Sequence, residues 1–176
     1  MLLDSPPVIL ISGIPGAGKS TIARALAARS ERGVHIEGDA LQRMIVSGGE
    51  WPSAEITPEA ARQMDLRLAN ACLLAQSFAK AAFTVVLDDV LIAFRLDDYR
   101  ARLSSLELYF VLLLPDLDAL RQRNAGRPDK DVFEAWKFLD AEVRHTTPAG
   151  LWLDTTALSE EETVHEIEQH LAEARL

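Results

Sequence analysis

The sequence predicts an α/β domain in which helices cover both faces of a mainly parallel sheet. Short apolar runs alternate with helical segments along the 176 residues, which is the order of strand–helix–strand units. The run Phe83–Leu87 consists of apolar and β-branched residues, as in strands that are buried on both faces. A glycine-rich stretch follows the first run directly. We therefore expect a three-layer αβα sandwich whose ligands bind at the carboxyl edge of the sheet.

The glycine-rich stretch Gly13–Ser20 fits the spacing G-x-x-x-x-G-K-[ST] at every position. It lies between the apolar run Val8–Ile11 and a segment of helix formers, Thr21–Arg29. Backbone N–H groups and the start of the helix then face the phosphates of a nucleotide. Lys19 is expected to reach the β- and γ-phosphates, and Ser20 to hold Mg²⁺. The predicted nucleotide contacts in this loop are Gly13, Pro15, Gly16, Ala17, Gly18, Lys19, Ser20 and Thr21.

The later elements follow from periodicity and from helix-start and turn residues. Thr57 and Pro58 begin the longest predicted helix, as N-cap and first helical residue. Ser159, with Glu162 three residues later, caps the last one. Further strands are expected at 34–37, 83–88, 107–114 and 151–154. Helices are expected at 40–46, 58–81, 96–103, 116–124 and 131–145, and after 159.

The whole chain is long enough for one core, so we expect one domain over residues 1–176. Asp and Glu outnumber Lys and Arg by 27 to 18, giving a net charge of −9, which disfavours nucleic-acid binding. Neither a basic leader nor a long apolar span is visible, so we expect a cytoplasmic protein with no membrane partner. We expect a monomer or a small homo-oligomer.

Two adjacent acids end the third predicted strand. Asp88 is in the setting of the carboxylate that helps to hold Mg²⁺ opposite Ser20. The side chain of Asp89 points the other way if the strand continues, because side chains alternate along a strand. Asp89 is therefore either a residue that faces the acceptor or one partner of a structural ion pair.

Asp39 follows the second predicted strand and is preceded by Gly38. Phosphoryl transfer to an alcohol uses a carboxylate that accepts the hydroxyl proton or orients the oxygen, and Asp39 is the candidate. Alternatively, Asp39 is the N-cap of a helix that begins at Ala40, and both roles are compatible. Glu37 is the rival base, although its place in the strand favours a surface acid.

Arginines cluster after the fourth predicted strand, at positions 121, 123 and 127. Arg123 and Arg127 are candidates for stabilising charge in the transition state from a lid at about 116–131. The alternative is a solvated helix face balanced by neighbouring acids. The helical region at about 40–83 is expected to bind the acceptor. Arg43, Trp51 and the segment 44–56 are candidates for lining that site, and the alternative for Trp51 is that it covers the sheet edge.

The remaining residues of chemical interest predict no further site. His35, His145, His165 and His170 show no metal-ligand spacing with the single cysteine, Cys72. We expect these histidines to be surface or ordinary packed residues, and Cys72 to be a packed thiol.

With these motifs in view, the chain resembles small P-loop kinases of the nucleoside-monophosphate-kinase-like group, most of all the chloramphenicol phosphotransferase family and related small-molecule kinases. The phosphate loop, Asp39, the motif Leu87–Val90 and the arginine-bearing segment carry the resemblance. It implies a P-loop NTPase fold with a five-stranded parallel sheet of order 2-3-1-4-5, ATP with Mg²⁺, and Asp39 as the acid that activates the acceptor. It also implies that Asp154–Thr156, including Thr155, lies near the nucleotide base.

The predicted function is ATP-dependent transfer of the γ-phosphate to a hydroxyl of a small molecule. The acceptor stays open among antibiotics, sugar acids, nucleosides and sugar nucleotides, because the Asp-Gly-Phe-Pro-Arg run of adenylate kinases is absent. The alternative is a nucleotide-dependent ATPase or regulatory switch without a small-molecule acceptor. A GTPase is disfavoured, since Asn70 and Asn124 are each followed by Ala, so no Asn-Lys-x-Asp motif is present.

Overall fold

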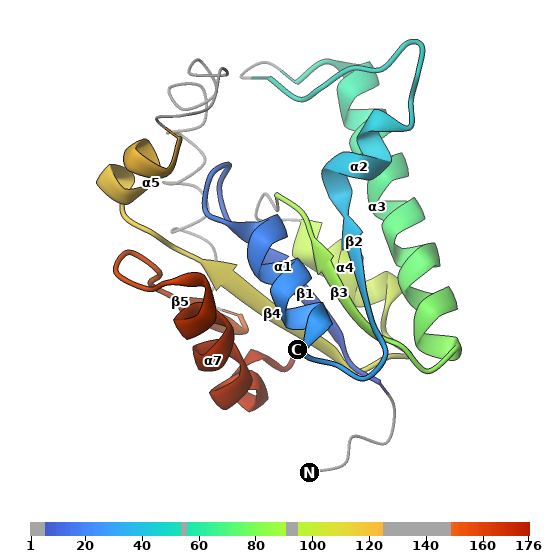
Figure 1. Ribbon diagram of the computed structural model, residues 1–176. Helices are drawn as coiled ribbons and strands as arrows, with labels where there is room; N and C mark the ends of the chain where they lie inside the picture. Colours follow the sequence, from blue (N-terminus) through green and yellow to red (C-terminus); the bar gives the residue numbers. More distant parts are fainter. Residues whose placement is uncertain (1–5, 54–55, 91–94, 125–148) are drawn as a thin grey trace.

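The computed structural model describes residues 6–53, 56–90, 95–124 and 149–176, with the backbone alone at 121–124 (Figure 1). Five strands form one sheet in the order β2-β3-β1-β4-β5. Every neighbouring pair of these strands is parallel, so the predicted fold class and strand order are confirmed. The strands are β1 (Val8–Ser12), β2 (Gly33–Glu37), β3 (Thr84–Asp88), β4 (Leu108–Leu113) and β5 (Leu151–Leu153).

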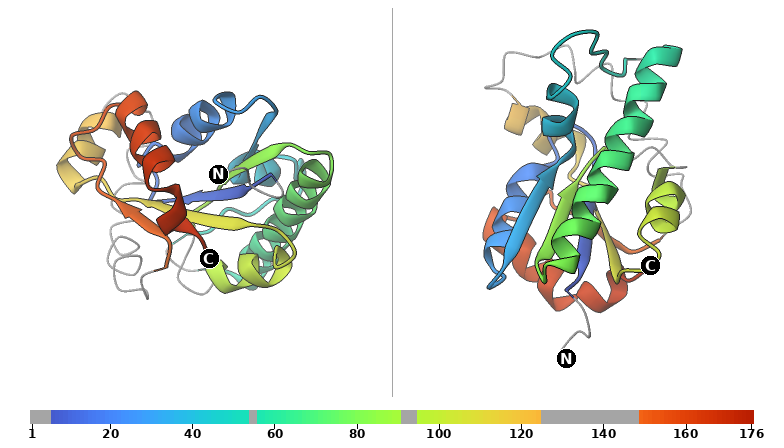
Figure 2. Two further views of the ribbon diagram at one scale, coloured as in Figure 1. Left: turned by 90° about the horizontal axis from the view of Figure 1, so that it is seen from below. Right: turned by 90° about the vertical axis from the view of Figure 1, so that its right-hand side faces the viewer.

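Helices cover both faces of the sheet, as the two further views in Figure 2 show. One face carries α1 and α7, and the opposite face carries α3 and α4 (Figure 2). The described helices are α1 (Lys19–Ala28), α2 (Gly38–Arg43), α3 (Pro58–Lys80), α4 (Arg95–Arg102), α5 (Leu117–Asn124) and α7 (Glu160–Gln169), followed by the 3₁₀ turn η1 (Leu171–Ala174). Each of these α-helices begins within two residues of its predicted start.

Alternation along the strands gives each face its own hydrophobic core. Ile11 and Val86 pack with α1 and α7, whereas Leu10 and Leu87 pack with α3 and α4. Cys72 lies in the second of these cores, where burial raises the pKa of its thiol to about 11. The thiol is therefore packed and protonated, as expected from the sequence.

Helix caps explain where two of the helices begin. The Thr57 side chain accepts a hydrogen bond from the backbone N–H of Ala60, and Pro58 is the first residue of α3. Ser159 and Glu162 form a reciprocal capping box at the start of α7. Both caps were predicted from the sequence.

The helix after β2 differs from its prediction at both ends. It begins at Gly38 with Glu37 as N-cap, so the alternative that Asp39 caps a helix starting at Ala40 is wrong. The chain turns directly from the strand into the helix because Gly38 fits against the Asp88 carbonyl, where a Cβ would lie 3.0 Å from the oxygen. The helix ends at Arg43, before the β-branched pair at 45–46.

The expected helix at 131–145 lies outside the described residues. None of the described helices combines the length and the apolar character needed to span a membrane.

Two glycines with the same backbone conformation permit a test of close packing. Gly150 has a φ of 72° and Gly48 a φ of 73°. A Cβ on Gly150 would lie 2.3 Å from the Phe110 backbone oxygen, whereas a Cβ on Gly48 would meet nothing within 4 Å. Gly48→Ala should therefore cost only the left-handed strain of about 1–2 kcal/mol. Gly150→Ala should cost roughly 1–3 kcal/mol more.

Urea unfolding of the two variants measures this difference. Equal losses of unfolding free energy in both variants would show that the approach of residue 150 to β4 does not constrain the fold.

Candidate active site

The loop between β1 and α1 has the geometry of a phosphate-binding loop. Gly13 follows β1 directly with a φ of 155°, and a Cβ there would lie 2.8 Å from the Leu113 backbone oxygen. The loop therefore packs against β4 in a way that only glycine permits. Gly18 is the N-cap of α1, and Lys19 is the first helical residue, with its ammonium 3.3 Å from the Ile14 carbonyl. Backbone N–H groups at this helix start are available to an anion.

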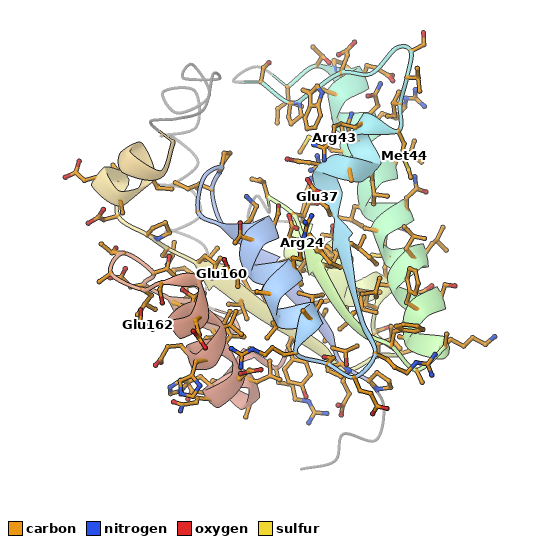
Figure 3. The ribbon with its side chains drawn as sticks, in the orientation of Figure 1. Arg24, Glu37, Arg43, Met44, Glu160 and Glu162 are labelled. Carbon is orange, nitrogen blue, oxygen red and sulfur yellow. The ribbon has the colours of Figure 1, made fainter. Side chains whose placement is uncertain are left out.

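A pocket opens between this loop and the segment that joins β5 to α7. The phosphate loop, α1 and the β5–α7 segment all line it, and Thr155 in its wall is buried. Glu160, labelled in Figure 3, belongs to the wall from the first turn of α7. The full lining is Gly16, Ala17, Gly18, Thr21, Ile22, Thr155, Leu158, Ser159, Glu160 and Thr163.

Five of the predicted nucleotide contacts share this pocket. They are Gly16, Ala17, Gly18, Thr21 and Thr155. The pocket wall formed by 158–163 was not predicted from the sequence. The capping box at Ser159 could have indicated it, because this motif places the start of α7 just after the carboxyl end of β5.

Asp88 ends β3 with its carboxylate facing the start of α1. The Ser20 hydroxyl donates a hydrogen bond to Asp88 Oδ1 at 3.2 Å, and Asp88 is only 3% exposed. Hard oxygen donors of this kind suit Mg²⁺, which usually keeps one or two protein ligands beside phosphate oxygens and water. Within the described residues no group of three or more His, Cys, Asp or Glu side chains is arranged to hold a metal ion. Ser20 and Asp88 thus fit a Mg²⁺ that reaches the site with a nucleotide.

The second oxygen of Asp88 contacts His35, for which the sequence predicted no functional role. His35 Nε2 lies 2.5 Å from Asp88 Oδ2, and the His35 side chain is 12% exposed. In the parallel register of β2 and β3, Glu37 pairs with Asp88. His35 is two residues earlier on β2 and so shares the face of Asp88. Only this register, which the sequence does not display, brings the two side chains together.

Asp39 stands in the first turn of α2, close to the end of β3. Its neighbour Gly38 would place a Cβ 3.0 Å from both the Asp88 carbonyl oxygen and Asp89 Oδ1. Asp39 itself is exposed. A solvent-accessible carboxylate therefore lies beside the buried acids of β3.

Glu37, the rival base, is held by an arginine. Arg43 donates a hydrogen bond to Glu37 at 2.8 Å, and Figure 3 labels both residues where α2 meets β2. The hydrogen bond that Arg43 donates to Glu37 raises the pKa of Arg43, with smaller contributions from the charges of Glu37 and Asp39. The pairing with Arg43 supports the prediction that Glu37 is a surface acid.

Asp89 forms a buried ion pair on the opposite face of the sheet. Arg67 of α3 lies 2.8 Å from Asp89 Oδ1, and both side chains are at least 95% buried. The Tyr99 hydroxyl and the Val90 N–H donate to the same carboxylate. Burial raises the pKa of Asp89, and the charge of Arg67 opposes that rise. Of the two alternatives, the structural ion pair is the one observed.

The segment after α2 is fixed to α3 by two glutamine side chains. Gln63 Oε1 accepts hydrogen bonds from Gln42 Nε2 at 3.0 Å and from the Glu50 N–H at 2.8 Å. Gln63 Nε2 donates to the Gly48 carbonyl at 2.7 Å. Trp51, one of the residues expected to line the acceptor site, is 51% exposed on this segment.

The lid arginines cannot be placed from the described side chains. Arg123 lies in the last turn of α5, for which the backbone alone is described, and Arg127 lies outside the described residues. Their proposed role stays a prediction.

The fold and this site define a P-loop α/β domain with the architecture of the small nucleotide-dependent kinases. A family model described as an AAA domain (AAA_33) matches residues 8–147. The chain therefore belongs to this AAA domain family. A search of curated proteins finds no match.

Solved structures share the fold, and two of the three described next are kinases by name. The tunicamycin resistance protein of Deinococcus radiodurans matches with a TM-score of 0.68 at 18% identity, over 97% of this chain and 98% of that chain. The gluconokinase of Sinorhizobium meliloti 1021 matches with a TM-score of 0.63 at 21% identity, over 95% and 92%. The APS kinase CysC of Mycobacterium tuberculosis, in complex with AMPPNP and APS, matches with a TM-score of 0.67 at 16% identity, over 96% and 98%. The predicted resemblance to small P-loop kinases is confirmed for the fold.

The buried ion pair behind the site gives a stability prediction. Arg67→Met leaves the Asp89 charge buried without its cation, and Asp89→Asn leaves Arg67 without its anion. Each single change should cost about 3–5 kcal/mol of unfolding free energy. The double variant should lose clearly less than the sum, because it buries no isolated charge. Urea unfolding of all four proteins measures the coupling, and additive losses would contradict this account.

Proposed function

We propose that this protein is an ATP-dependent phosphotransferase that moves the γ-phosphate of ATP to a hydroxyl of a small molecule. The observation that carries the proposal is the position of Asp39. Gly38 packs against the end of β3, so that the exposed residue Asp39 follows at the edge where Asp88 faces the phosphate loop. Phosphoryl transfer to an alcohol needs such a group beside the phosphates.

Each part of the site has a proposed role in this reaction. The backbone N–H groups of Gly16, Gly18 and Lys19 hold the phosphates, whereas the Ala17 N–H donates to the Ile14 carbonyl. The Lys19 ammonium neutralises the β- and γ-phosphates. Ser20 and Asp88 hold Mg²⁺, which supplies further neutralisation of the phosphate charge when it is bound. Asp39 orients the acceptor oxygen and accepts its proton. Arg123 or Arg127 from the lid stabilises charge in the transition state.

The pocket between the phosphate loop and α7 is the proposed place of the adenine base. Thr155 and Thr21 line it from the two sides, and Ile22 and Leu158 add apolar surface. Stacking against apolar groups with a few polar contacts is typical of nucleotide sites. The bound nucleotide of the APS kinase structure, AMPPNP, supports an adenine nucleotide for this fold.

The segment that follows α2 supports an acceptor with an apolar face. Met44, Val46, Trp51 and Ile56 are exposed by 72%, 96%, 51% and 45%. Clustered exposed apolar side chains often mark a binding surface. One of the compared structures is named as a gluconokinase and another as a tunicamycin resistance protein. Because these names point to different compounds, the acceptor is proposed only as a small hydroxyl compound.

Measurement of ADP release from MgATP tests the function directly. A panel of amphenicols, aminoglycosides, sugar acids, nucleosides and sugar nucleotides covers the proposed acceptors. One class should stimulate ADP release, and that compound should gain the mass of one phosphate. Steady acceptor-independent hydrolysis with no stimulation across the panel would contradict the proposal and favour an ATPase or a switch.

The change Asp39→Asn tests the proposed base. Transfer should fall by about 100-fold to 10,000-fold, because the amide cannot accept the hydroxyl proton. The KM for ATP should stay close to the wild-type value, since Asp39 contacts the acceptor rather than the nucleotide. Steady-state kinetics with the stimulating acceptor measure both quantities.

Glu37→Gln is the matched control, two residues away on the same edge. Its carboxylate is paired with Arg43, so transfer should change little. A large loss in Glu37→Gln combined with normal transfer in Asp39→Asn would give the base role to Glu37.

A further inference from the structure

The carboxylate of Asp88 is held from two sides. On one side Ser20 of α1 donates to Oδ1 at 3.2 Å. On the other side His35 of β2 lies 2.5 Å from Oδ2. With the Nε2–H tautomer of His35, the ring donates and the carboxylate oxygen accepts. A hydrogen bond to a carboxylate is stronger than one between neutral groups.

This contact fixes the rotation of the Asp88 carboxylate about its terminal bond. The terminal torsion of an Asp side chain is broad. A carboxylate held at neither oxygen would therefore sample a range of rotations, at an entropic cost on binding a metal. With Oδ2 held by His35, Oδ1 stays turned toward Ser20.

The surroundings make His35 suited to this task. Asp88 is buried, and the His35 side chain is 12% exposed, so water competes weakly for the contact. On the other flank of β3, Asp88 pairs with the apolar residue Ile11. The carboxylate accepts hydrogen bonds from Ser20 and His35.

We infer that His35 is a positioning residue for metal binding, which holds Asp88 so that one of its oxygens is preorganised for Mg²⁺. His35 acts through Asp88 and touches neither nucleotide nor metal. Partners that hydrogen-bond to a metal-ligating carboxylate typically contribute 10-fold to 100-fold to metal affinity. The inference rests on the proposed binding of Mg²⁺ with a nucleotide, but it requires neither an acceptor nor phosphoryl transfer.

Paired substitutions of His35 separate this role from a structural one. His35→Gln keeps an N–H donor at the same number of bonds from Cα as His Nε2. His35→Asn is one bond shorter, so its amide cannot reach Asp88 in the same way. His35→Leu removes the donor altogether. The three variants thus differ chiefly in whether the donor reaches the carboxylate.

The measurement is the binding of AMPPNP by calorimetry, in EDTA and over a series of Mg²⁺ concentrations. Binding in EDTA should be equal in all variants, because the loop holds the phosphates. The Mg²⁺ concentration needed for half of the increase in affinity should rise by about 10-fold or more in His35→Asn and His35→Leu. It should stay near the wild-type value in His35→Gln.

Two control variants set the limits of the expected effect on Mg²⁺ dependence. Asp88→Asn should lose most of the Mg²⁺-dependent increase. His170→Asn alters an exposed histidine that pairs with Glu173 on the far end of α7, and it should behave as wild type. A thermal melt of each variant shows whether the fold is retained.

The proposal has clear contrary outcomes. Wild-type Mg²⁺ dependence in His35→Asn would overturn it, as would equal impairment of the Asn and Gln variants. Failure of both of these variants to fold would also overturn it, because His35 would then act on stability. Absence of any acceptor in the transfer assay would leave this result intact, since the binding assay contains no acceptor.

Discussion

The parallel register of β1, β2 and β3 is the constraint on which the site depends. Asp88 on β3 pairs with Ile11 on one side and with Glu37 on the other. The three strands therefore end together at one edge, where the phosphate loop and α2 begin. A shift of β2 by one residue would turn His35 to the opposite face. The same shift would move Gly38 away from the end of β3.

The sequence predicts features that neighbouring residues determine better than features that depend on contacts between distant segments. Local signals succeeded, as at the caps Thr57 and Ser159. The alternation of side chains placed Asp88 and Asp89 on opposite faces, which the partners Ser20 and Arg67 confirm. The strand order did not follow from periodicity, because pattern shows where strands lie but not which strands pair. It came only from the resemblance to known kinases.

Two of the missed features share one physical cause. His35 contacts Asp88, 53 residues away along the chain, only because β2 and β3 pair in one register. The start of α2 at Gly38 likewise depends on a contact with the end of β3. Both are set by tertiary packing, which overrides the local preference of Asp for a helix N-cap. The nearby sequence carries no trace of either contact.

The acids Asp88 and Asp89 are both buried at this edge of the sheet, but they have different partners and therefore suit different roles. Asp89 is buried with a full countercharge, Arg67, and two further donors, so it is suited to holding β3 against α3 and α4. Asp88 is buried and held by the hydroxyl of Ser20 and the imidazole of His35 rather than by a guanidinium. A carboxylate has about four lone-pair positions, so these two contacts leave room for a cation beside Ser20.

Asp39 is the third acid at this edge and, unlike Asp88 and Asp89, it is exposed. The chain as a whole has a net charge of −9. An acidic chain still binds the anionic phosphates, since the loop N–H groups and Lys19 act at short range, whereas the distant charges are screened by salt. The acids near the phosphates then disfavour a nucleotide without its metal. In the proposed function, this balance favours the Mg²⁺ complex over free ATP, and the orientation of the Asp88 carboxylate then matters for binding.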